Sequence, residues 1–79
     1  MRKIIANNIR NYLDRNVKGS VSVRDNGKTL FISIVYTSIV FRTKVENLDT
    51  LILNGYSAQH IGCNILIEYQ KYLKSIFFK

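Results

Sequence analysis

The residues best suited to catalysis or metal binding in this chain are one histidine and one cysteine, His60 and Cys63. On a helix they would be neighbours, since residues three or four apart share a face. A zinc site needs three or four converging ligands, and a cysteine nucleophile needs an oriented base and oxyanion donors. The sequence supplies no such partners, so we expect His60 to be a solvated or capping residue and Cys63 to be a packing residue.

The other groups on which catalysis commonly relies are scattered along the chain. The five carboxylates form no pair suited to acid–base work, and the four glycines form no phosphate-binding loop. A chain of 79 residues also has only a small core and no room for a deep internal site. We therefore predict no enzymatic activity, no metal and no cofactor.

Positive charge is in excess and lies in the first half of the chain. The sequence has 12 Lys and Arg against 5 Asp and Glu, a net charge of +7. Nine basic and two acidic residues fall in residues 1–45, and three of each fall in residues 46–79. Such a field favours phosphate backbones or acidic protein surfaces. A charge that serves only solubility is the alternative.

The elements that must position these charges begin with a helix and a strand. Apolar residues recur at helical spacing over about 3–15, which predicts an amphipathic helix. From Val17 to Arg24 apolar and polar residues alternate, which predicts a half-buried strand.

A hairpin is the strongest local signal. Asn26 and Gly27 tolerate the positive φ that a two-residue type I′ loop requires at both central positions. The register predicted from this loop has as its facing pairs Val23 with Leu30, Val21 with Ile32, Gly19 with Ile34, and Val17 with Tyr36.

A third strand is predicted over residues 39–45, turned at Thr37 and Ser38; one long bent strand over residues 29–45 is the alternative. In the three-stranded arrangement, one sheet face gathers cations around an aromatic ring. Cations beside a stacking ring are what single-strand binders use. The predicted site for nucleic acid or an acidic partner is Lys18, Arg24, Phe31, Arg42 and Lys44.

Two helices complete the chain. Asn47 is a candidate N-cap for a short helix that Asn54 and Gly55 end, and Ser57 caps a long helix from residue 58 to about 77. The predicted fold is a single α+β domain over residues 1–79: helix, three-stranded antiparallel sheet, short helix, long C-terminal helix.

The long helix has more apolar surface than a small sheet can cover. Its large apolar residues span an arc of about 160° on a helical wheel. We expect part of this surface to contact a partner, in the first place a second copy; full coverage by the chain's own helices is the alternative. The predicted interface residues are Cys63, Ile67, Tyr69, Phe77 and Phe78.

No membrane association is predicted. No apolar stretch approaches the roughly 18 residues of a membrane span, and the apolar run after Lys3 is too short for a signal peptide. The lone cysteine suits a reducing compartment. We expect the protein to be cytoplasmic.

Two nucleic-acid-binding folds invite comparison. The order helix, three strands, helix resembles the double-stranded RNA-binding domain, but that domain opens its last helix with a lysine cluster, whereas this chain has Ser57-Ala58-Gln59-His60. Residues 51–61 resemble the first helix and turn of a helix-turn-helix unit. The helix that follows is apolar at Ile61 and Ile65, which predicts a packed core helix instead of a recognition helix.

The last third of the chain resembles small uncharacterised proteins of phages and prophages of low-GC Gram-positive bacteria. The residues that carry the resemblance are Asn54-Gly55-Tyr56-Ser57, then Ile61, Ile65, Glu68-Tyr69, Tyr72 and the closing Phe77-Phe78-Lys79. The resemblance implies a non-enzymatic inhibitor of a host system, a class that includes anti-CRISPR proteins. With a net charge of +7, this chain cannot mimic DNA through an acidic surface.

The expected function is therefore that of a phage accessory protein that inhibits a host defence nuclease from its basic sheet face. The expected partner is a host protein or ribonucleoprotein complex in the bacterial cytoplasm, with contact to RNA or DNA phosphates. A stand-alone nucleic-acid-binding accessory protein and a homodimeric protein-interaction module are the alternatives.

Overall fold

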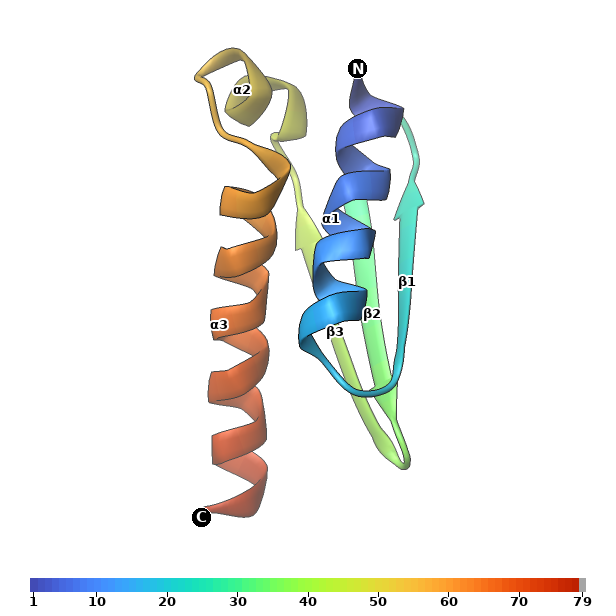
Figure 1. Ribbon diagram of the computed structural model, residues 1–79, viewed down its shortest axis with the longest axis vertical. Helices are drawn as coiled ribbons and strands as arrows, with labels where there is room; N and C mark the ends of the chain where they lie inside the picture. The colour runs from blue at the N-terminus through green and yellow to red at the C-terminus, as the bar shows by residue number, and fades with distance from the viewer. Residues whose placement is uncertain (79) are drawn as a thin grey trace.

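The computed structural model describes residues 1–78 and has the predicted α+β order (Figure 1). Its elements are α1 (Arg2–Asn16), β1 (Ser20–Asp25), β2 (Leu30–Tyr36), β3 (Ile39–Val45), α2 (Leu48–Leu53) and α3 (Ala58–Phe77). The strands form one antiparallel sheet in the order β1-β2-β3. The two long helices, α1 and α3, pack against each other on one face of this sheet, and no helix of the described residues lies over the opposite face (Figure 1).

The core lies between α1, α3 and the inner face of the sheet. Its members recur every three or four residues on the helices and every second residue on the strands, as the sequence pattern predicts. The buried apolar residues are Ala6, Ile9, Leu13, Leu30, Ile32, Ile34, Phe41, Leu48, Ala58, Ile61, Ile65 and Tyr69. Because the central strand β2 supplies three of them, it fixes which sheet face is covered.

The β1–β2 hairpin differs from the predicted one. Val23 pairs with Ile32 and Val21 with Ile34, so each residue of β1 faces a partner two positions beyond the predicted one. A shift of two residues leaves every side chain on its predicted face. The predicted covered face is therefore retained although the register was wrong.

The cause of the shift is the side chain of Asn26. The Asn26 Oδ1 accepts hydrogen bonds from the backbone N–H groups of Lys28 (3.0 Å) and Thr29 (2.8 Å). The backbone N–H of Asn26 donates to the Thr29 carbonyl (3.2 Å). Gly27 has a φ of +96°, whereas Asn26 does not enter the positive-φ region. The predicted type I′ loop with Asn26 and Gly27 at its centre was wrong, because Asn26 instead closes the loop from one side.

The β2–β3 turn lies at Thr37 and Ser38 as predicted, with Tyr36 paired to Ile39, so the alternative of one long bent strand was wrong. Thr37 has a φ of +53°, which is unfavourable for a β-branched residue. The regular pairing on both sides holds the turn in this strained conformation.

The short helix α2 ends in the way the Asn54-Gly55 pair predicts. Gly55 has a φ of +88° and its N–H donates to the Ile52 carbonyl, while the Tyr56 N–H donates to the Leu51 carbonyl. These two bonds satisfy carbonyls that the end of a helix leaves free. At the other end, Asn47 is the N-cap residue but its side chain makes no capping hydrogen bond.

The long helix α3 begins at the predicted cap, because the Ser57 hydroxyl accepts a hydrogen bond from the His60 N–H at 3.1 Å. Within residues 1–78, no helix is both long and apolar enough to cross a membrane.

An unanticipated ion cluster ties three elements together at one end of the molecule. Arg2, at the start of α1, contacts Asp25 at the end of β1 (Nη2 to Oδ1, 2.6 Å) and Asp49 in α2 (Nη1 to Oδ1, 2.8 Å). The Arg2 guanidinium and the Gly27 N–H together hold the pKa of the Asp25 carboxyl below its usual range. The charge of Arg2 is therefore neutralised within the chain.

Candidate functional site

The uncovered face of the sheet, here called the outer face, is the candidate site. Its side chains form three rows across the strands, set by the strand register. The rows are Arg24–Phe31–Lys44, Ser22–Ser33–Arg42 and Ser20–Val35–Val40. Four of the five predicted binding residues, Arg24, Phe31, Arg42 and Lys44, thus come together at one end of this face.

The first row places an aromatic ring between two cations. The Arg24 guanidinium lies 5.5 Å from the centroid of the Phe31 ring, within the range of a cation–π contact. The Phe31 side chain stays 36% exposed, so this ring is accessible. Lys44 pairs with Glu46 (Nζ to Oε1, 3.0 Å), but both side chains are more than half exposed, and such a pair is weak and screened by salt.

A shallow depression of about 370 Å³ lies beside the ring. It is lined by Ser22, Arg24, Phe31, Ile32, Ser33 and Arg42. The two serines were placed on this face by the strand alternation but were not predicted as site residues. Because their hydroxyls can donate and accept hydrogen bonds between two guanidinium groups, they belong to the site.

Lys18 was wrongly placed in this site. The strand β1 begins only at Ser20, and Lys18 lies in the preceding loop, where it lines a separate groove of about 220 Å³ with Leu66 and Leu73 of α3. The cause is Gly19, whose φ is +110° and at which any side chain would collide with the Val35 carbonyl oxygen. The left-handed backbone at Gly19 ends the strand alternation.

Tyr69 was wrongly predicted as an interface residue, because it belongs to the core. It is 4% exposed, and its ring lies 5.4 Å from that of Phe41. Burial raises the pKa of its hydroxyl. Cys63 is only half-buried and lies beside Tyr12, whose pKa is raised first by burial and then by its contact with Cys63.

The other predicted interface residues are exposed. Phe77 is 62%, Phe78 81% and Ile67 44% exposed. The last turns of α3 extend beyond the end of α1 (Figure 1), so the chain's own helices do not cover the whole apolar arc. Ile76 and Phe77 lie in the last turn of α3, and Phe78 is its C-cap residue; we call these three exposed residues the apolar patch of α3.

The side chains of the outer face are suited to binding anions and planar groups. The outer face offers three cations, three serine hydroxyls and one aromatic ring, which can hold anions and stack against a planar group. In the part of the chain that the structure describes, no three His, Cys, Asp or Glu side chains converge as a metal site. Comparison with protein-family models, curated proteins and solved structures finds no match to this chain.

Proposed function

We propose that this chain is a non-enzymatic protein that binds single-stranded RNA or DNA on the outer face of its sheet. The observation that carries the proposal is the row Arg24–Phe31–Lys44 with Arg42 beside it. Cations bind the phosphates, and the exposed Phe31 ring offers a stacking platform for one base. None of the outward positions in the three rows is a carboxylate, and the one carboxylate that contacts a row, Glu46, does so through a weak, exposed pair with Lys44.

The number of cations sets the expected salt dependence. Three phosphate contacts predict that log affinity falls with log salt with a slope of about −2 for a single strand. Between 50 and 200 mM salt the affinity should therefore fall roughly 20-fold. Arg2 is left out of this count because Asp25 and Asp49 neutralise it.

Fluorescence anisotropy with a labelled oligothymidine tests the proposal. We expect Arg42→Ala to weaken binding and to reduce the slope by about 0.7. Lys71→Ala is the matched control, since it removes an exposed cation on α3, away from the outer face, and should leave the slope unchanged. Absence of binding at low salt, or equal effects of the two substitutions, would overturn the proposal.

A second candidate function is inhibition of a host defence nuclease of the CRISPR type. The observation that favours it is the apolar patch of α3, since an apolar contact together with a cationic face suits a ribonucleoprotein target. The resemblance to phage proteins supports the same function. Inhibition should fall for Phe77→Ser combined with Phe78→Ser while oligothymidine binding stays unchanged.

The test of this second candidate is a cleavage assay with a purified CRISPR effector and its guide RNA. Lack of both complex formation and inhibition would refute it. The alternative occupant of the apolar patch is a second copy of this chain. If a second copy binds there, the melting temperature should rise with protein concentration.

A further inference from the structure

The helix α1 has an exposed face that neither the core nor the ion cluster uses. This face, the α1 outer face, points away from the sheet (Figure 1). Its exposed side chains between residues 3 and 15 are Lys3, Ile4, Asn7, Asn8, Arg10, Asn11, Asp14 and Arg15. Amides and cations dominate it, with a single carboxylate.

The asparagines on this face are not explained by folding. Asparagine costs about 0.6 kcal/mol relative to alanine at a helix position, and exposed positions are best filled by Ala, Glu, Lys or Gln. Asn16 is explained by folding, because its side-chain amide donates a hydrogen bond to the Tyr12 carbonyl at 2.7 Å near the end of the helix. Within residues 1–78, no hydrogen bond involves the side chains of Asn7, Asn8 or Asn11.

The cations of this face are also free. The ion pairs among residues 1–78 are those of Arg2 and Lys44 only, so Lys3, Arg10 and Arg15 are all unpaired. Asp14 carries the one negative charge on this face. The face is therefore net positive and presents side-chain donors to an external partner.

We propose that α1 binds in the major groove of duplex DNA and contacts base edges there. A helix with its side chains is 10–12 Å wide, and the groove is about 12 Å wide. Asparagine can pair with both edge atoms of adenine, and arginine with both edge atoms of guanine. Asn7 and Asn11, one turn apart, lie at the middle of the face, with Lys3 and Arg15 toward its ends.

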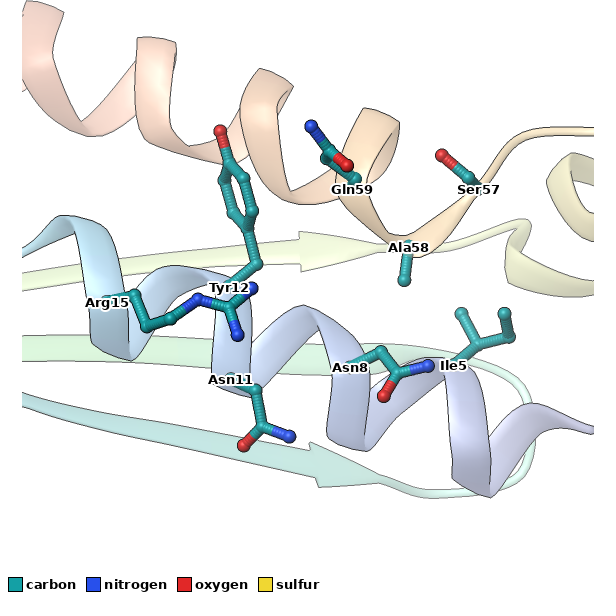
Figure 2. A pocket seen from close by; sticks show the side chains of 8 residues that line it. All are labelled: Ile5, Asn8, Asn11, Tyr12, Arg15, Ser57, Ala58 and Gln59. Atoms are coloured by element: carbon teal, nitrogen blue, oxygen red, sulfur yellow. The ribbon is translucent and has the colours of Figure 1, made fainter.

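A groove lies beside α1, where the proposal places one DNA backbone. It has a volume of about 420 Å³ and lies between α1 and the start of α3, as Figure 2 shows. Its lining includes Asn8, Asn11 and Arg15 of α1, Ser57 just before α3, and Gln59 in the first turn of α3. Its lining residues include no carboxylate and offer amide, hydroxyl and guanidinium donors to the phosphates that border the major groove.

This site is independent of the proposed single-strand site. The outer face of the sheet and the α1 outer face lie on opposite sides of the sheet and share no residue. Duplex RNA should bind less well than duplex DNA, because the A-form major groove is too deep and narrow for side chains to read.

Selection from a pool of duplex DNA with randomised sequence tests the inference. The wild-type chain should enrich a short motif. Asn7→Ala combined with Asn11→Ala should abolish the enrichment and weaken binding to the selected duplex by roughly tenfold per amide. The same variant should have a raised melting temperature, so lost binding cannot be ascribed to unfolding.

Arg24→Ala combined with Arg42→Ala is the matched control. It should weaken oligothymidine binding and leave both motif and duplex affinity unchanged, which separates failure of the single-strand site from failure of this one. The inference is overturned if the wild type enriches no motif, if the double asparagine variant binds the selected duplex as tightly as the wild type, or if duplex RNA competes as well as duplex DNA.

Discussion

Gly62→Ala should destabilise the protein although it improves helix propensity. Gly62 is buried in α3, and a Cβ added there would lie 2.7 Å from Cδ2 and 3.2 Å from Cγ of Tyr12 on α1. Replacing a helical glycine with alanine contributes about 1 kcal/mol of stability. Overpacking a close contact costs about 1–3 kcal/mol. The clash involves the inner part of the Tyr12 ring, which cannot move without displacing the side chain, so we expect a net loss of about 1 kcal/mol.

A double-mutant cycle followed by urea unfolding isolates this effect. In a Tyr12→Ala background the ring is gone, so Gly62→Ala should raise the free energy of unfolding by about 1 kcal/mol. The substitution should thus change sign between the two backgrounds, with a coupling energy of about 2 kcal/mol. An increase in stability in both backgrounds would refute the close α1–α3 contact. Equal m-values in all four proteins are the control for two-state unfolding.

Three further predictions concern single positions. Thr37→Asn should raise the free energy of unfolding by about 1 kcal/mol, because asparagine tolerates the φ of +53° that strains threonine; chemical denaturation measures it. Arg2→Met should make stability less dependent on acid pH. Because the pKa of Asp25 is lower in the folded state than the unfolded value of about 3.9, its carboxylate stabilises the fold above that value. The contribution is lost as pH falls below it through the folded-state pKa. An unchanged acid profile in Arg2→Met would contradict the ion cluster. Phe31→Ala should weaken oligothymidine binding about tenfold by anisotropy while leaving the salt slope unchanged, and a changed slope with unchanged affinity at low salt would argue against stacking.

The order of the elements was predictable from the sequence because each has a clear hydrophobic period. The position of the turn at Asn26 and Gly27 was predicted from the sequence, but its hydrogen bonding and the strand register were not. The Asn26 side chain closes the loop where a backbone carbonyl was expected, and nothing in the residue types distinguishes these two uses. The predicted inner and outer faces of the sheet were still correct, because the observed register differs from the predicted one by two residues.

The residues placed wrongly were those whose surroundings depend on distant parts of the chain. Lys18 leaves the outer face because Gly19 approaches the Val35 carbonyl, a contact that forms only when β1 and β2 pair. Tyr69 lies on a wide apolar arc, and a helical wheel cannot tell which part of such an arc faces the sheet, the neighbouring helix or water. Only the packing against Phe41 decides that Tyr69 is in the core.

The charge of the two proposed surfaces indicates which partner they bind, whereas their exposure does not. Two helices on one side of a small sheet leave the outer face and the α1 outer face in water, so solubility alone requires both to be polar. It does not require one sign of charge, since mixed charges serve solubility equally well. Yet among residues 1–78 the α1 outer face has one carboxylate, Asp14, and the three rows of the outer face have none, with Glu46 beside Lys44 at their edge.

The carboxylates near these surfaces are instead engaged within the chain. Asp25 and Asp49 pair with Arg2, and Glu46 pairs with Lys44 through a weak, exposed contact. The fold thus neutralises Arg2, at the start of α1, and leaves Arg24, Arg42 and the cations of the α1 outer face without an ion pair. Uncompensated cations on exposed surfaces raise the free energy of the compact state through repulsion, and a polyanion relieves that repulsion. This is the physical reason that nucleic acid is the partner proposed for both surfaces.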